Sequence, residues 1–196
     1  MVAVITVLAI AIFVWTALRA LFYAPDSEAR VPTWAMIAIA PDSSKPVRLQ
    51  IPSLHIDANV QNVGLNAMGN VQAPDNFTDV GWYKYGTVPG YLGSAVIDGH
   101  VDNGLALSGV FKHLEDIKVG DQVYIITQGG SKLHFVVTDI VQYPYTNAPI
   151  NLIFGQNDTP RLNLITCTGT WVAGKDTYSE RLVVFTKLSP SSRLSE

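Results

Sequence analysis

Cysteine and charge are the scarcest features of this 196-residue chain. Its single cysteine, Cys167, cannot form an internal disulfide, so stability must come from packing. Charged residues make up 15% of the chain, and 13 Lys and Arg residues are scattered against 16 Asp and Glu, for a formal net charge of −3. The absence of a basic stripe argues against nucleic-acid binding. With 48% hydrophobic residues, the length suits one compact domain with an appendage.

The longest apolar run lies at the N-terminus, between Val2 and Leu18. Its length predicts a membrane-spanning anchor over residues 1–24. A cleaved signal peptide would need a basic start, which the run lacks, and a buried core helix is the remaining alternative. Arg19 and Arg30 follow the run, and by the positive-inside rule they favour a cytoplasmic main domain.

Long helical patterns are rare after the apolar run, whereas short strand-like segments are frequent. Proline-rich composition predicts a linker over 25–46, followed by a β-barrel domain over 47–188 and a polar tail over 189–196. The glycines of 128–131 predict a hairpin, and short helical turns are expected at 108–114 and 151–155. The expected strands cover residues 47–51, 58–63, 69–72, 93–97, 122–128, 132–142, 161–166 and 181–186.

The segment 181–185 is apolar on both faces of its predicted strand. One face would fill the barrel, and the other must be covered by a loop, a short helix or a ligand. This leaves room for a groove lined with hydrophobic side chains.

Cys167 follows the apolar segment 162–165, at the point where we expect a strand to give way to a loop. A thiol placed there can face a cleft while a sheet holds its backbone, as a nucleophile requires. The alternative is a small hydrophobic residue in the core, where free cysteines are common.

A cysteine nucleophile needs a proton-transfer partner, and His100 is the histidine best placed for that role. It follows a predicted strand through Asp98-Gly99 and precedes a loop, so it can be presented to a cleft. We expect a boundary or solvated position for His134 and a surface position for His113, and nothing in the sequence distinguishes His55.

The candidate cation is Arg181, which opens a strand whose next residues are all apolar. A guanidinium at that position must find an acceptor, and a developing oxyanion or a substrate carbonyl would serve. The alternative is a salt bridge to Glu180 or Asp176.

Together these segments resemble the sortases, the cysteine transpeptidases of bacterial surfaces. The similarity lies in 95–100, 164–167 and 181–184, supported by 81–83, 89–90 and 93–96, and it runs from about Val47 to Leu188. Within the family the chain looks most like classes E and F.

The resemblance implies a mainly β fold, a closed eight-stranded barrel with short helices, and a transpeptidase activity. Cys167 would attack the Thr–Gly bond of an LPxTG-type sorting motif on a surface protein, and His100 would protonate the leaving amine and activate the incoming one. Arg181 would steady the oxyanion, and an amine of a peptidoglycan precursor or a pilin lysine would resolve the thioester. Thr166 would help to line the site, and the apolar residues expected beside it in the substrate groove are Ile165, Val96 and Val183.

Two residues depart from the family pattern. Asp98 stands where a small apolar residue is expected, and Asn163 replaces a threonine. If Asp98 and Asp102 lie close to His100, they should favour its protonated form and raise its pKa.

No metal or other cofactor is expected. Asp98, His100 and Asp102 do not meet a calcium-loop pattern, and one histidine with one distant cysteine is poor zinc spacing. Some sortases are activated by calcium, but no acidic cluster in the sequence supports it here.

The family also bears on location, because sortases are anchored by a single membrane pass with the catalytic domain outside the cell. We follow the family over the weak signal of Arg19 and Arg30. Two alternative functions remain open from sequence. One is a membrane-tethered cysteine hydrolase that uses water, and the other is a non-catalytic barrel that binds peptide or wall polymer.

Overall fold

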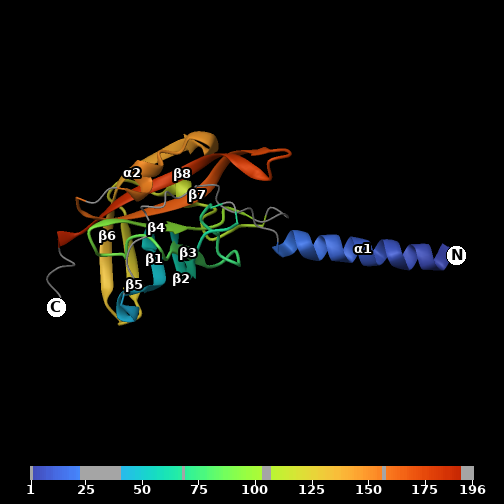
Figure 1. Ribbon diagram of the computed structural model, residues 1–196, viewed down its shortest axis with the longest axis horizontal. Coiled ribbons are helices and arrows are strands. Elements are labelled where there is room, and N and C mark those ends of the chain that lie inside the picture. Colours follow the sequence, from blue (N-terminus) through green and yellow to red (C-terminus); the bar gives the residue numbers. More distant parts are fainter. Residues whose placement is uncertain (1, 23–40, 68, 103–106, 156–157, 191–196) are drawn as a thin grey trace.

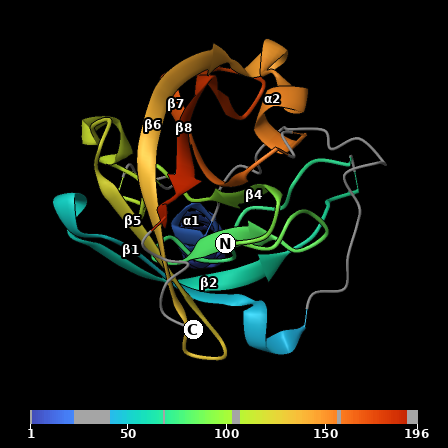
Figure 2. The ribbon, with the colours of Figure 1, turned by 90° about the vertical axis from the view of Figure 1, so that its left-hand side faces the viewer.

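The computed structural model describes residues 2–22, 41–67, 69–102, 107–155 and 158–190 and forms a closed β-barrel. Around the barrel the strand order is β1-β2-β3-β4-β7-β8-β6-β5, and Figures 1 and 2 show the ring from two sides. The predicted mainly β fold is therefore confirmed. The strands are β1 (Pro46–Ile51), β2 (Ile56–Val63), β3 (Val80–Tyr83), β4 (Gly93–Asp98), β5 (Gln122–Thr127), β6 (Lys132–Pro144), β7 (Pro160–Val172) and β8 (Thr177–Leu188).

The helices are short apart from the N-terminal one. They are α1 (Val2–Phe22), α2 (Ile150–Phe154) and the single 3-10 turns η2 (Asp42–Ser44), η3 (Pro52–Leu54), η4 (Leu114–Asp116) and η5 (Tyr145–Asn147). The helical turn expected at 151–155 is α2. The one expected at 108–114 is instead a series of turns that leads into η4.

One predicted strand is wrong and one was missed. Residues 69–72 form no strand, although Val71 bridges Leu65, because the chain turns sharply at Gly69, whose φ of +81° belongs to the left-handed region. The missing strand is β3, which pairs parallel with β2 and antiparallel with β4. Its four residues are all buried, so the strand carries no alternation of polar and apolar residues. The hairpin predicted at 128–131 is confirmed between β5 and β6, where Gly130 has a φ of +85°.

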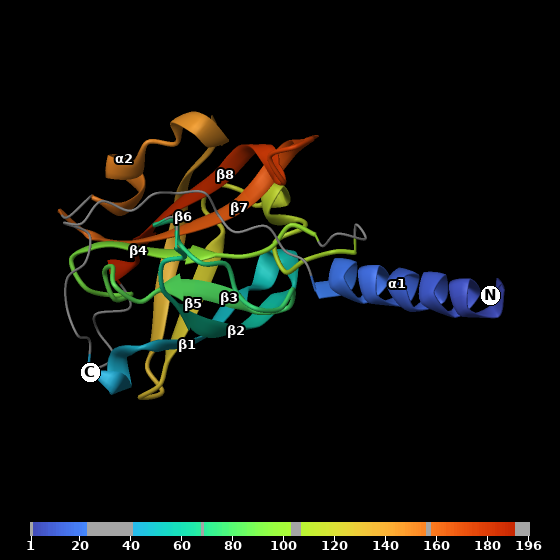
Figure 3. The same ribbon diagram turned by 45° about the vertical axis from the view of Figure 1, so that its right-hand side comes forward.

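Strand β8 divides its apolar residues between two cores. Leu182 and Val184 point into the barrel, whereas Val183 and Phe185 belong to a second cluster outside it. Helix α2 covers that second cluster with Ile153, and Figure 3 shows α2 outside the sheet formed by β4, β7 and β8. The outer apolar face of β8 is thus covered by a short helix, one of the three coverings expected from its sequence.

Asn163, one of the two departures from the family pattern, fixes this helix to the sheet. Its side-chain amide donates a 2.6 Å hydrogen bond to the carbonyl of Ile153, and the side chain is fully buried. The amide N–H is thus satisfied, whereas the buried Oδ1 of Asn163 has no hydrogen-bond partner among the described residues.

The N-terminal helix α1 lies apart from the barrel in Figure 1, and large apolar side chains such as Phe13 are exposed on it. Within the described residues, no helix combines the length and the apolar character needed to cross a bilayer. Residues 1, 23 and 24 of the predicted anchor, residues 25–40 of the predicted linker and residues 191–196 of the predicted tail lie outside the described residues.

Candidate active site

Strand pairing brings the three candidate catalytic residues to one end of the barrel. Cys167 on β7 lies directly opposite Arg181 on β8, so their side chains share one face as cross-strand neighbours. Strand β4 runs parallel to β7 with Asp98 beside Ile165, and two residues beyond that pair lie His100 and Cys167. Residues separated by 67 and 14 positions from Cys167 therefore meet beside its thiol.

The strand does not end at Cys167, contrary to the expectation from sequence. β7 continues to Val172, and the register with β8 shifts between Thr168 and Trp171. Gly169 lies within this register shift and has a φ of +84°. Only glycine fits this position, because a Cβ here would lie 2.4 Å from the Ser179 hydroxyl. The thiol is half-buried, one residue before the distortion. The bulge, and not a loop, presents Cys167 to the cleft.

Arg181 is 5% exposed and holds its guanidinium with neutral oxygens of its own strand. Nη2 donates a 2.7 Å hydrogen bond to the Thr177 hydroxyl. Nη1 donates hydrogen bonds to the backbone carbonyls of Tyr178 (3.1 Å) and Glu180 (3.0 Å). The alternative salt bridge to a carboxylate of Glu180 or Asp176 is absent among the described residues. Within the described residues no carboxylate neutralises the guanidinium, and it lines the same cleft as Cys167.

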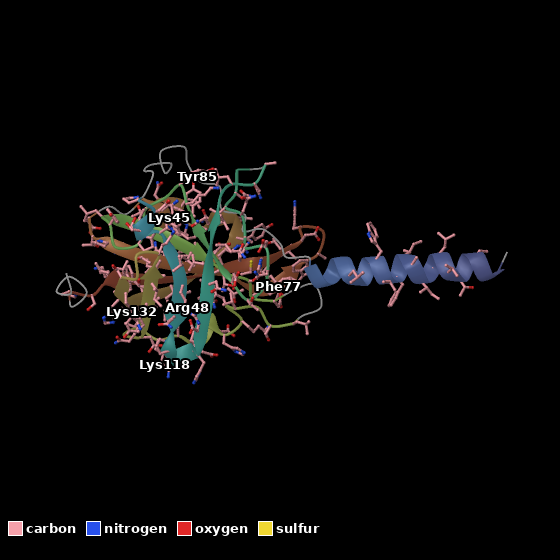
Figure 4. The ribbon with its side chains drawn as sticks, turned by 90° about the horizontal axis from the view of Figure 1, so that it is seen from below. Lys45, Arg48, Phe77, Tyr85, Lys118 and Lys132 are labelled. Carbon is pink, nitrogen blue, oxygen red and sulfur yellow. The ribbon has the colours of Figure 1, made fainter. Side chains whose placement is uncertain are left out.

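His100 is 6% exposed and is held by a loop that precedes β3. Its Nε2 lies 2.9 Å from the carbonyl oxygen of Pro74, and the ring of Phe77 packs against the imidazole with 5.3 Å between centroids. A carbonyl can only accept a hydrogen bond, so this contact places a proton on Nε2. Figure 4 shows Phe77 at the end of the barrel nearer to α1, away from Lys118 and Lys132.

Side-chain amides and a carboxylate hold that loop in shape. Asn76 accepts hydrogen bonds from the backbone N–H of Thr78 (3.0 Å) and of Asp79 (2.8 Å). Burial pushes the pKa of Asp79 upward, but hydrogen bonds from Gln61, Asn76 and Asn59 outweigh burial and hold the pKa below its usual value.

Of the residues expected to bind substrate, two line the cleft and two do not. Ile165 and Thr166 line it with the three candidate catalytic residues, and the Thr166 hydroxyl donates a 2.8 Å bond to the Gly99 carbonyl, which ties β7 to the segment before His100. Val96 and Val183 are buried in the cluster under α2 and offer almost no surface in this conformation. Their role in substrate binding stays a prediction.

Two separate spaces reach Cys167. The first is a cleft of about 20 Å³ that contains His100, Cys167 and Arg181, which is room for about one water molecule. The second is a cavity of about 370 Å³ on the other side of Cys167, bordered by Phe111, Lys112 and strands β6 to β8. Only the second has room for a substrate group in this conformation.

Sequence reasoning missed a hydrogen bond at the boundary of these spaces. The Tyr178 hydroxyl lies 2.6 Å and 2.8 Å from the two carboxylate oxygens of Asp102. Asp98, the other carboxylate near His100, is buried in the first cleft beside Gly81, where a Cβ would lie 2.6 Å from its Oδ1. No group of three acidic, histidine or cysteine residues within the described ranges has the arrangement of a metal site.

Comparisons with known proteins agree with this geometry. A family model described as the sortase domain matches residues 49–189, more than half of the chain. The fold is similar to sortase A from Corynebacterium diphtheriae (24% identity, TM-score 0.55, 74% of this chain and 61% of that one). It is also similar to Streptococcus agalactiae sortase C1 (25%, TM-score 0.56, 73% and 68%) and to the pilus-related sortase C of Group B Streptococcus (17%, TM-score 0.57, 85% and 77%). No curated protein matches the sequence.

Proposed function

Because the chain belongs to the sortase family, we propose that it is a cysteine transpeptidase that cleaves an LPxTG-type sorting motif between Thr and Gly and transfers the acyl group to an amine. The observation that carries the proposal is the convergence of Cys167, His100 and Arg181 on one cleft. The three side chains supply what acyl transfer through sulfur needs, namely a nucleophile, a proton carrier and a cation.

In the proposed reaction Cys167 attacks the threonine carbonyl as a thiolate, and the charge that develops on the oxygen is stabilised by Arg181. His100 gives its Nδ1 proton to the leaving glycine amine and later takes a proton from the incoming amine. The Pro74 carbonyl holds Nε2 throughout, which fixes the ring for both transfers.

The test is to incubate the full chain in detergent with a panel of LPxTG-like peptides, with and without a triglycine amine, beside Cys167→Ala. We expect the wild type to give ligated product with amine and to show a thioester adduct by mass spectrometry, whereas Cys167→Ala gives neither. Cleavage to free acid alone at saturating amine would identify a hydrolase. A Cys167→Ala protein that retained every measurable phenotype would support a non-catalytic barrel.

We further propose that the partners are surface proteins with an LPxTG-like sorting signal and an amine acceptor, from a peptidoglycan precursor or a pilin lysine. The sortase C of Group B Streptococcus is pilus-related, so the amine panel includes a pilin lysine. The three sortases of known structure compared with this chain are of the A and C types, so the assignment to class E or F stays a prediction from sequence.

The location is proposed from the family and the sequence: a single-pass anchor over residues 1–24 with the barrel outside the cell. The exposed apolar side chains of α1, such as Ile5 and Phe13, support a lipid partner for this helix. Fractionation and protease treatment of intact cells test this, and protection of the barrel from protease would overturn the orientation.

A further inference from the structure

Tyr178 joins two segments that border Cys167 from opposite sides. It lies near the start of β8, half-buried, with its ring edge-on to Trp171 across the hairpin at 5.4 Å between centroids. Its hydroxyl reaches Asp102, two residues after His100. Asp102 is fixed in turn by a bridge to Ser108 and by Lys112 at 3.5 Å. The bond therefore links the strand of Arg181 to the segment of His100.

The two spaces that reach Cys167 meet at this bond. Four residues line both the 20 Å³ cleft and the 370 Å³ cavity, namely Val101, Asp102, Cys167 and Tyr178. Two of the four are the hydrogen-bonded pair, and a third carries the thiol. The pair thus forms the boundary between the cleft, which holds His100 and Arg181, and the larger cavity.

The hydroxyl is well suited to hold this boundary at neutral pH. Burial raises the pKa of Tyr178, and its hydrogen bond to the Asp102 carboxylate and the negative charges of Asp102 and Cys167 raise it further. The group therefore remains a protonated donor, and a bond to a charged acceptor is stronger than one between neutral groups.

Acyl transfer makes the boundary matter, and this step of the argument depends on the proposed function. A thioester at Cys167 Sγ can react with a primary amine, which forms a C–N bond, breaks the C–S bond and gives one proton to His100. Water can react instead, which forms a C–O bond, breaks the same C–S bond to release the Cys167 thiolate, and gives one proton to His100. The ratio of the two products reports how the thioester is exposed to each nucleophile.

We propose that Tyr178 is a positioning residue whose hydrogen bond to Asp102 closes the small cleft toward the larger cavity. Less water then reaches the thioester carbonyl beside His100 and Arg181, and reaction with the amine is favoured over hydrolysis. When the bond is broken, the cleft and the cavity merge beside Cys167. Water can then reach the thioester carbonyl from the larger cavity, where no protein group orients the attacking nucleophile. The backbone carbonyl of Tyr178 has the separate task of accepting a bond from Arg181.

The decisive variant is Tyr178→Phe, because it removes the hydroxyl but keeps the ring and the carbonyl that holds Arg181. The full chain in detergent is given an LPxTG-type peptide and triglycine, and ligated and hydrolysed products are quantified by mass spectrometry. Losing a bond to a charged acceptor changes an equilibrium by about tenfold or more, so the ratio of hydrolysis to ligation should rise about tenfold. Both products arise from one thioester, so the ratio does not depend on how much enzyme is folded.

Four control variants make the result specific. Tyr124→Phe removes a surface tyrosine hydroxyl that bonds Gln122 on β5, and the ratio should stay at the wild-type value. Asp102→Ala should raise hydrolysis as Tyr178→Phe does, and the double variant should add little to either single one. Rescue by Asp102→Asn, which keeps an acceptor oxygen, should be partial.

The possible outcomes separate this inference from the proposed function. A wild type that ligates, together with a Tyr178→Phe variant that keeps the wild-type ratio, overturns the role of Tyr178 alone. Fully additive effects of the two single variants also overturn it, because the residues would then not act through their mutual bond. A wild type that never yields ligated product overturns the transfer reaction itself.

Discussion

Replacing Thr177 by valine tests whether the neutral oxygens around Arg181 make it a functional cation. Thr177 is 1% exposed, and its hydroxyl accepts a 2.7 Å bond from Nη2 of Arg181. Valine has nearly the same shape, so the change removes an acceptor without leaving a large cavity. Nη1 keeps its two carbonyl partners, so the guanidinium stays in place but is free to tilt.

The magnitude follows from the burial of the charge. A hydrogen bond to a charged group contributes about 1.5–3 kcal/mol, so the free energy of unfolding should fall by that amount. For a chain of this size we expect Tm to fall by about 3–12 °C. Removing a direct oxyanion donor costs about 10²–10³ in rate, and loosening one that stays in place should lower kcat/KM by about tenfold.

The assay pairs thermal unfolding with cleavage of a fluorogenic LPxTG-type peptide. Thr177→Ser is the matched control, because it keeps the hydroxyl and loses one methyl, at about 0.8 kcal/mol. Serine should recover most of the activity even where it is no more stable than valine. Wild-type kcat/KM and Tm in Thr177→Val would refute the claim that this hydroxyl holds the guanidinium.

Three further predictions concern the surroundings of His100. Gly109→Ala would place a Cβ 2.3 Å from the His100 carbonyl oxygen, so the backbone must shift, and we expect kcat/KM to fall at least tenfold with a loss of about 1–3 kcal/mol in unfolding. Asn76→Ala loosens the loop that presents the Pro74 carbonyl to Nε2, so the imidazole is held less firmly, and we expect kcat/KM to fall about tenfold. Asp79 has a lowered pKa in the fold, so its stabilising effect should be present above about pH 3.9 and be lost as pH falls through the folded value, a dependence that Asp79→Asn should remove in Tm measurements.

The barrel could be predicted because most of its strands carry local signals. Glycine at 129–130 predicted the β5–β6 hairpin, and the apolar residues 182–185 predicted a strand buried on both faces. Strand β3 was not predicted because its pairing with β2 is parallel and depends on tertiary contacts. The strand predicted at 69–72 was wrong because the segment has the composition of a strand but turns back on itself at Gly69.

The site could be predicted only where the residue type itself indicates the chemistry. Cys167 is the sole thiol, and His100 follows a strand beside glycine. The Pro74 contact uses a backbone carbonyl, which every residue has, so no sequence pattern marks it. The bond between Asp102 and Tyr178 joins residues 76 positions apart, and neither is unusual in its local sequence.

Arg181 shows how little separates a structural charge from a functional one. Sequence pointed to Glu180 as a partner, and Glu180 is a partner, but through its backbone carbonyl and not its carboxylate. A carboxylate would have neutralised the guanidinium, and the cleft would then have held a buried ion pair with no net charge near the thiol. A carbonyl satisfies the N–H group and leaves the charge intact. The same two residues can therefore make a salt bridge or an oxyanion stabiliser, and the strand geometry that turns the Glu180 carbonyl toward Arg181 decides which.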